Sequence, residues 1–363
     1  MLLLKGFVHL SVKTIYMNPT KISIPLSLIF FFLLITSSIF GQSYQKISIG
    51  FYNLENLFDT IDSPDINDIE FTPNEPKKWD TRKYFEKLDN MASAIAKIAV
   101  DKTPEGMAVI GLCEMENKEV LIDLANHPLL KKRNYKIVHY NSPDKRGIDV
   151  ALLYQDALFE LESSYNFPLT INNVSDFYSR DQLLVTGKLL GERVYFIVNH
   201  WPSRSGGENE TADLRKAAGD LGRKISDFII GMDPNAKIMY MGDFNDDPHN
   251  VSITEHLKAS GDKQLATNGY FNPYASLHKP DNFGSLAYRG KWNLFDQIVV
   301  TPSLLTKKPK KWYLEQPFVF DAEFLKNKDG NYMGFPFRTF AGNTFLGGFS
   351  DHLPVYIVLQ RSN

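Results

Sequence analysis

Residues 237–246 read Lys-Ile-Met-Tyr-Met-Gly-Asp-Phe-Asn-Asp, an apolar run that ends at Asp243 and Asn245. The run has the length of a buried strand. Further apolar runs of this kind, each with polar residues at one end, lie at residues 47–52, 107–113, 150–154, 194–198, 298–301 and 355–359. Helical patterns fall between several of them, at residues 79–100, 118–124 and 209–230. This alternation predicts an α/β protein.

The polar residues stand at opposite ends of different strands. Those that follow their strands are Asn53, Glu55, Glu114, Asn199, His200, Asp243 and Asn245, and those that precede them are Asp149, Asp296, Asp351 and His352. If they share one site, strands of the first kind must run opposite to strands of the second. We therefore predict a mixed sheet with the site along one edge. An extended backbone would turn Asn53 and Glu55 to one face, and likewise Asp243 and Asn245.

The residue types in this set predict hydrolysis at phosphorus. Carboxylates are hard oxygen ligands for Mg²⁺, Mn²⁺ or Ca²⁺, and the set offers Glu55, Glu114, Asp243 and Asp351. His200 and His352 can transfer protons or stabilise charge. A single Asp or Asn after a strand is usually a turn or a helix cap. Here, however, each of the seven apolar runs has polar residues of this set at one end, and this repeated arrangement favours a site.

Six ordered motifs carry a family resemblance: Tyr52-Asn53-Leu54-Glu55, Gly111-Leu112-Cys113-Glu114, Asn199-His200, Gly242-Asp243-Phe244-Asn245, Phe295-Asp296-Gln297-Ile298 and Ser350-Asp351-His352. Together they resemble the endonuclease/exonuclease/phosphatase superfamily over about residues 47–359. The resemblance implies a four-layer α/β sandwich, with two mixed β-sheets packed face to face and helices outside.

The resemblance also implies a metal site and a water-positioning pair. Glu114 matches the principal metal carboxylate, with Asn53 near the metal or the phosphate. Glu55 falls at a position that is often acidic, and Asp351 matches a metal ligand or a water-activating carboxylate. Asp243 and Asn245 match the pair that positions the nucleophilic water and the scissile phosphate. The implied cofactor is Mg²⁺, with Mn²⁺ or Ca²⁺ as alternatives.

Two histidines complete the implied machinery. His352 matches the histidine at the scissile phosphate, with Asp296 as its orienting carboxylate. His200 matches the second histidine, and Asp149 is its expected acidic partner. Asn199 and Arg204, from the stretch Asn199-His200-Trp201-Pro202-Ser203-Arg204, are expected to bind substrate.

Two residues near the metal glutamate depart from the pattern or compete with it. Cys113 stands where many members of the superfamily have Gln, which removes an amide from the phosphate region. Cys113 itself lies in an apolar run and is expected to be core. Glu116 is a rival carboxylate, because an extended backbone would turn it to the same face as Glu114.

Residues 1–41 have the layout of a secretory signal peptide. Lys5, Lys13 and Lys21 precede an apolar run at 26–35, small residues follow it, and no acidic residue occurs. We hypothesise that translation starts at Met17; an uncleaved anchor is the alternative. Residues 42–363 are expected to form one exported, periplasmic or secreted domain without a membrane span. Residues 318–349 are expected to be a long surface loop or hairpin, with a turn at Asp329-Gly330.

Charge leaves the substrate open. The 363-residue chain has a net charge of −2, and removing residues 1–41 takes away three lysines and no acidic residue, which leaves −5. This charge argues against a broad basic DNA groove, although local basic groups such as Arg204, Arg289 and Lys291 could suffice. We expect an exported endonuclease that cleaves DNA or RNA, with no stable protein partner. The alternatives are a phosphatase or a phospholipid or sphingomyelin phosphodiesterase and, from another class, a non-catalytic binding protein.

Overall fold

The computed structural model describes residues 43–64, 66–171 and 176–363. The segment expected to be a signal peptide, together with Met17, lies outside these ranges. The chain divides into the units Met1–Ser43 and Tyr44–Asn363. Within the described ranges, no helix is both long and apolar enough to cross a membrane.

The described residues of the second unit form three α-helices, two large sheets and two two-stranded sheets. The α-helices are α2 (Thr81–Lys97), α3 (Lys118–Asn126) and α4 (Ala212–Met232). The strands are β1 (Tyr44–Leu57), β2 (Met107–Met115), β3 (Tyr135–His139), β4 (Asp149–Gln155), β5 (Phe159–Phe167), β6 (Gln182–Leu189), β7 (Glu192–His200), β8 (Ile238–Asp243), β9 (Ala259–Ser260), β10 (Tyr270–Phe271), β11 (Leu286–Tyr288), β12 (Lys291–Asn293), β13 (Asp296–Val300), β14 (Tyr313–Val319), β15 (Phe340–Ala341), β16 (Thr344–Phe345) and β17 (Val355–Ser362). Short helical turns lie at Ile69–Phe71, Lys131–Arg133, Ser252–His256, Leu265–Asn268, Pro302–Leu304, Glu323–Leu325 and Gly330–Tyr332.

Both large sheets are mixed, as the polar residues predicted. The first sheet has the order β14-β17-β1-β2-β4-β3, and the second has the order β5-β6-β7-β8-β13-β10-β9. In the first, β1 is parallel to β2, while β17 and β4 are antiparallel to them. In the second, β7 is parallel to β8, and β13 is antiparallel to β8. Strands with polar residues at their ends therefore oppose those with polar residues at their starts.

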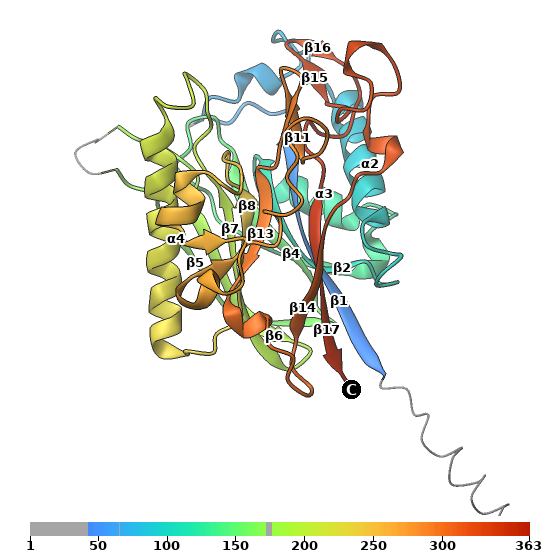
Figure 1. Ribbon diagram of the computed structural model, residues 1–363. Coiled ribbons are helices and arrows are strands. Elements are labelled where there is room, and N and C mark those ends of the chain that lie inside the picture. Colours follow the sequence, from blue (N-terminus) through green and yellow to red (C-terminus); the bar gives the residue numbers. More distant parts are fainter. Residues whose placement is uncertain (1–42, 65, 172–175) are drawn as a thin grey trace, which may run out of the picture. The chain divides into compact units, whose positions relative to one another are not determined.

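The layers are helices, first sheet, second sheet and helix, which confirms the expected four-layer sandwich. Figure 1 shows α2 and α3 outside the first sheet and α4 outside the second. Alternate residues of the central strands face different apolar layers. On β1, Phe51 lies between the sheets and Tyr52 faces the helices. On β8, Met241 lies between the sheets and Tyr240 faces α4.

The two sheets approach closely at Gly111 of β2. A Cβ atom placed there would lie 2.7 Å from Met241 Sδ and 3.1 Å from a Val198 methyl carbon, and both of these residues belong to the second sheet. A larger residue would therefore force the opposing side chains to shift. Cys113, on the same strand, is buried in this layer as expected.

Some local expectations were wrong. The helical spacing of the apolar residues at 79–100 groups Phe85 with Leu88, Ala92 and Ile95 on the face expected to be buried, but Phe85 is 54% exposed. Asp329-Gly330 lies in a chain reversal that an antiparallel bridge between Lys326 and Pro336 closes, but a short 3-10 helix at Gly330–Tyr332 replaces the expected tight turn; a second reversal in this region pairs β15 with β16. Strands such as β5 were missed, since its outward residues are charged or polar and an edge strand needs few apolar side chains.

Lys87 of α2 is fully buried and ties the helix to the 339–349 segment. Its Nζ donates to Thr339 Oγ1 at 2.6 Å and to the carbonyl of Phe349. Burial lowers the pKa of Lys87 to about 8, although the Glu55 and Asp351 carboxylates oppose the shift.

This lowered pKa predicts a pH dependence of stability. Between pH 8 and the ordinary value of 10.5, the unfolded chain binds more protons at Lys87 than the folded chain does. The free energy of unfolding should therefore rise with pH by about 3 kcal/mol relative to a Lys87→Met variant. Urea unfolding of both proteins at pH 8 and pH 10.5 measures the difference, and a constant gap would contradict the prediction.

Candidate active site

Asp243, at the end of β8, lies at the centre of the site and is buried. Its Oδ2 accepts a hydrogen bond from Asn53 Nδ2 at 3.1 Å. The same oxygen lies 3.6 Å from His200 Nε2 and 3.8 Å from His352 Nε2. The register places Asp243 opposite His200 of β7 and Asp296 of β13. The site thus joins side chains from both sheets.

The same turn shapes the chain at Asn53 and at Asp243. Asn53 Oδ1 accepts from the backbone N–H of Glu55, and Asp243 Oδ1 accepts from that of Asn245, each at 2.9 Å. Glu55 has a φ of 46° and Asn245 a φ of 50°. The expectation that an extended backbone turns each pair to one face was therefore wrong. The first residue of each pair instead fixes the turn that redirects the second.

Gly242 allows the close pairing of β7 and β8 beside the site. A Cβ atom at Gly242 would lie 2.4 Å from the backbone oxygen of Asn199. A backbone atom cannot move aside as a flexible side chain can. The Gly-Asp-Phe-Asn sequence therefore needs its glycine for packing, while Asp243 and Asn245 supply the polar groups.

Glu114 sits at a bulge that separates it from Glu116. The pairing of β2 with β4 shifts register between Cys113 and Met115, and Glu114 has a φ of 59°. Bulges of this kind re-aim a side chain. Glu114 Oε1 lies 3.8 Å from His200 Nε2. Glu116 instead accepts from the Asp59 N–H and the Ser63 hydroxyl, so only Glu114 joins the cluster around Asp243.

His352 is held by Asp296 and by two serines. Its Nδ1 lies 2.7 Å from Asp296 Oδ2, which also accepts from Ser285 Oγ at 2.5 Å. Ser350 Oγ accepts from the His352 N–H at 3.1 Å and donates to the Asn53 carbonyl at 2.8 Å. The pairing of His352 with Asp296 agrees with the sequence expectation. Ser285 was missed, because a lone serine before a strand carries no signal.

Asp149 does not orient His200. Asp149 Oδ2 is 2.8 Å from His139 Nε2, and its Oδ1 accepts from the N–H and hydroxyl of Ser142. His200 Nδ1 is buried without a hydrogen-bond partner in the described part of the chain. The expected Asp149–His200 pair is therefore wrong. Asp149 begins β4 two residues before Ala151, which pairs with His139 at the end of β3, and sequence spacing gives no warning of the contact.

This placement predicts a structural effect for Asp149→Asn. The substitution removes the charge from a buried hydrogen-bonded pair, so we expect the free energy of unfolding to fall by about 1–3 kcal/mol. The value of kcat should stay within about twofold of the wild type, because the hydrogen bonds of Asp149 go to His139 and Ser142 and not to the residues around Asp243. Chemical unfolding and steady-state kinetics measure the two effects. A loss of kcat at unchanged stability would restore the expected role beside His200.

The site separates its two histidines electrostatically. Burial opposes protonation of His352, yet Asp296 and Asp243 hold its pKa well above the ordinary value. Burial, together with Arg180 and Arg146, holds the pKa of His200 well below it. Burial also raises the pKa of Asp243 to about 7. Opposed shifts of this kind divide acid and base roles between neighbours.

Glu55 and Asp351 are joined by Arg338. The guanidinium lies 3.3 Å from Glu55 Oε1 and 3.0 Å from Asp351 Oδ2. Glu55 Oε2 also accepts from the Thr339 N–H. Burial and the nearby Asp351 raise the pKa of Glu55. The contacts of Arg338 with Glu55 and Asp351 were not predicted, because no spacing in the sequence connects these residues.

In the described residues, a three-residue cluster and the separate carboxylate Glu114 offer ligand atoms suited to a metal ion. Asp243, Asp296 and His352 offer three ligand atoms within 4.8 Å of one another. Hydrogen bonds to Asp296 Oδ2 already hold that carboxylate as the partner of His352. Glu114 differs, because its side chain is only 14% exposed and its carboxylate accepts no hydrogen bond from the residues described. A carboxylate that is mostly shielded from solvent and accepts no hydrogen bond fits a cation.

The remaining expected substrate residues are largely occupied. Arg204 Nε donates to the Asn245 carbonyl, and its other nitrogens meet Asp246 and Glu208. Asn199 Nδ2 donates to two backbone carbonyls, while its Oδ1 is buried and unpartnered. Arg204 therefore positions the Asn245 turn. Asn199 leaves only one atom free for a ligand.

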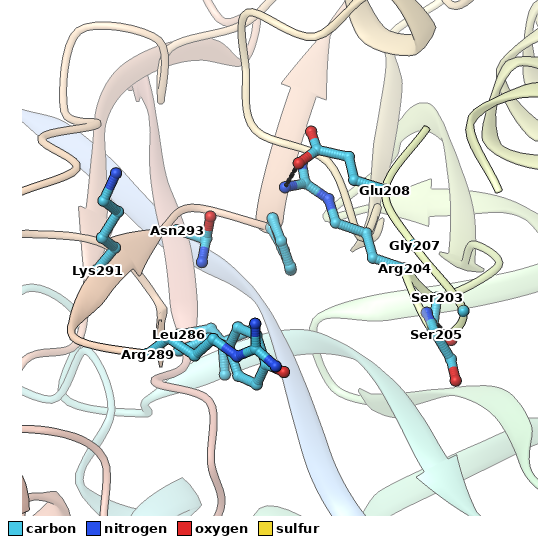
Figure 2. A pocket seen from close by; sticks show the side chains of 12 residues that line it. Ser203, Arg204, Ser205, Gly207, Glu208, Leu286, Arg289, Lys291 and Asn293 are labelled. Atoms are coloured by element: carbon cyan, nitrogen blue, oxygen red, sulfur yellow. Dashed lines mark hydrogen bonds and ion pairs between the residues drawn. The ribbon is translucent and has the colours of Figure 1, made fainter. Parts of the chain in front are cut away.

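A pocket of about 870 Å³ is lined by residues that neighbour the site, among them Leu286, which forms a bridge with His352, and Phe295, which precedes Asp296. It lies between the loop 203–208 that follows β7 and the hairpin of β11 and β12, with Phe295 on its wall. Figure 2 shows the Arg204–Glu208 ion pair on the loop side and Arg289, Lys291 and Asn293 on the hairpin side. The sequence did not predict this pocket, since Glu208 on one wall and Leu286 on the other are 78 residues apart in the chain.

Comparison with family models gives one match. A model described as the endonuclease/exonuclease/phosphatase family matches residues 48–361. No curated protein sequence matches the chain.

Solved structures with a similar fold cover most of the chain. An endonuclease/exonuclease/phosphatase family protein from Bacteroides thetaiotaomicron is 15% identical, with a TM-score of 0.53, and covers 89% of this chain and 97% of its own. A mannosyl-6-phosphatase from the same organism is 16% identical, with a TM-score of 0.51 and coverages of 86% and 99%. D. rerio TDP2 with a single-strand DNA product is 14% identical, with a TM-score of 0.50 and coverages of 87% and 99%. At these identities the likeness is one of fold.

Proposed function

The chain belongs to the endonuclease/exonuclease/phosphatase family, and from this membership we propose that it is an exported, divalent-metal-dependent phosphodiesterase that cleaves nucleic acid. The observation that carries the proposal is the position of Asp243 Oδ2, within 4 Å of Asn53, His200 and His352. A carboxylate, an amide and two histidines with opposed pKa shifts can serve proton transfer at a phosphate.

Glu114 is the proposed principal metal ligand. Asn53 and Asp243 offer further oxygens beside it, and Glu55 and Asp351 become available if Arg338 moves away. A bound Mg²⁺, or Mn²⁺ in its place, would polarise the phosphoryl group and lower the pKa of a bound water. The donor set consists of oxygens, which suits these hard cations.

The protein's own residues divide the remaining work. His352, kept protonated by Asp296 and Asp243, presents its Nε2–H to an oxygen of the scissile phosphate and stabilises the charge that develops there. Asp243 accepts a proton from the attacking water, for which a pKa of about 7 is suitable. Asn53 holds the Asp243 carboxylate in place. His200, which is neutral, presents Nε2 to the same space.

A chelator-controlled substrate panel tests the proposed function. The purified protein is incubated with single- and double-stranded DNA, RNA, sphingomyelin, phosphatidylcholine and sugar phosphates, each with Mg²⁺ and with excess EDTA. We expect nucleic acid to be cut only with Mg²⁺. Release of phosphate from a sugar phosphate, or of a headgroup from a lipid, without any nucleic-acid cleavage would assign the alternative phosphoesterase functions. Binding without hydrolysis of any substrate would favour a non-catalytic protein.

Export is proposed from the leader-like residues 1–41 alone. The full-length precursor is expected to lose this segment in a bacterial host, and the mature protein is expected in the periplasm or medium. Fractionation followed by N-terminal sequencing measures both. A protein that keeps residues 1–41 and sediments with membranes would instead be anchored.

A further inference from the structure

One wall of the pocket, the β11–β12 hairpin, is bonded at its base to the segment that carries His352. Leu286 of β11 forms a bridge with His352, and the Leu353 N–H donates to the Ser285 carbonyl at 2.7 Å. Ser285 also donates to Asp296. The base of the β11–β12 hairpin is therefore bonded on both sides of the His352–Asp296 pair, and a ligand held by the hairpin would sit at a fixed place relative to His352.

The hairpin tip is formed by a turn suited to a two-residue loop. Arg289 has a φ of 49° and Gly290 a φ of 80°, and Tyr288 pairs with Lys291 across the turn. Two central residues with positive φ match the twist of the flanking strands. Trp292 anchors the hairpin by packing edge-on against Phe335, with ring centroids 5.4 Å apart. The tip is thus presented by a preorganised arm.

The tip carries an exposed aromatic ring and two cations without acidic partners. Tyr288 is 61% exposed, and the Arg289 guanidinium lies 5.3 Å from the centre of its ring. Arg289 and Lys291 are exposed pocket residues, and neither forms an ion pair within the ranges that the structure describes. Across the pocket, Glu208 and Asp246 neutralise Arg204. The uncompensated charge of the pocket therefore belongs to the hairpin.

We propose that the hairpin tip is a subsite for single-stranded nucleic acid, in which Tyr288 stacks on an unpaired base while Arg289 and Lys291 bind the phosphates next to the scissile one. The inference rests on the proposed phosphodiesterase function. An aromatic ring flanked by cations is the arrangement that binds single strands, because every base has a face to stack and every linkage carries a charge. A substrate with one phosphate would place that group near His352 and leave both cations unused.

Binding of fluorescein-labelled octathymidylate with Mg²⁺ tests the subsite. The measurement uses the His352→Ala background, in which cleavage is suppressed. Tyr288→Ala should raise Kd about tenfold, since one stacked base contributes about 1–3 kcal/mol. Arg289→Ala/Lys291→Ala should reduce the slope of log Kd against log salt concentration by about 1.4, for two lost phosphate contacts. The matched control Lys307→Ala/Lys308→Ala removes the same charge outside the pocket, and it should leave both Kd and the salt slope unchanged.

Kinetics with the wild-type active site separate this inference from the proposed function. Hydrolysis of methyl 4-nitrophenyl phosphate, which has one phosphate, should change by less than about twofold in the hairpin variants, whereas KM for the oligonucleotide should rise about tenfold. Unchanged oligonucleotide binding in these variants would overturn the subsite alone. Displacement of the strand by mannose 6-phosphate more readily than by unlabelled octathymidylate would also overturn it. Failure of the wild type to hydrolyse any phosphodiester with Mg²⁺ would overturn the proposed function instead.

Discussion

Replacing His352 with alanine is expected to lower kcat for phosphodiester hydrolysis by about a thousandfold, within the range of one positioned proton donor. The side chain is buried, its Nδ1 is fixed by Asp296 and its Nε2 faces Asp243. Because the surrounding carboxylates hold its pKa well above the ordinary value, alanine removes a positive charge as well as a donor. The substitution should affect kcat much more than KM, since this charge acts mainly on the transition state.

His256→Ala is the matched control for this variant. His256 also pairs with a carboxylate, with its Nδ1 3.0 Å from Asp220 Oδ1, but it lies on the short helical turn Ser252–His256 beside α4. The kcat of the His256→Ala variant should stay within about twofold of the wild type. Steady-state kinetics at saturating Mg²⁺, with melting curves for both variants, measure the effects. Full activity in a folded His352→Ala protein would remove His352 from the catalytic machinery.

Glu114→Gln is expected to weaken Mg²⁺ or Mn²⁺ binding by about a hundredfold or more. Loss of outer-shell partners alone costs up to that factor, and a carboxylate in direct contact should contribute at least as much. The effect should be seen as a raised Kd for Mn²⁺ in titrations followed by electron paramagnetic resonance, without any substrate. Activity at limiting Mg²⁺ should fall in parallel and recover in part at high metal concentration.

Glu116→Gln separates the two neighbouring carboxylates. Glu116 accepts hydrogen bonds from the Asp59 N–H and the Ser63 hydroxyl. Its replacement should therefore change stability and leave the Kd for Mn²⁺ within about twofold. A reversal of these results, with metal affinity lost in the Glu116 variant and retained in the Glu114 variant, would make Glu116 the ligand.

The sequence was informative where a strand end determines the position of a side chain. Asp243, His200 and Asp296 end or begin strands that pair directly, so strand direction alone brings them together. The mixed sheets followed from the same reasoning. Buried strands such as β1 and β8 were also found, because residues that face two apolar layers form continuous apolar runs.

Contacts between distant loops could not be predicted. Arg338 reaches Glu55 from a segment with little regular structure, and Lys87 reaches Thr339 from a helix. The false pairing of Asp149 with His200 has the same origin, since two strand ends at one edge of a sheet do not determine which neighbour a carboxylate meets. The backbone turns at Glu55, Glu114 and Asn245 were also missed, because positive φ at these residue types depends on side-chain hydrogen bonds or bulges.

The separation of the two sheets at Gly111 is expected to affect the proposed catalysis. Glu114 and Asn53 belong to one sheet and Asp243 and His200 to the other, while Gly111 sets how near the two sheets lie just below them. The rate of hydrolysis should therefore depend on the distance between the two sheets. A graded series of side chains at Gly111 should change turnover in step with added volume, even though none of them touches the phosphate.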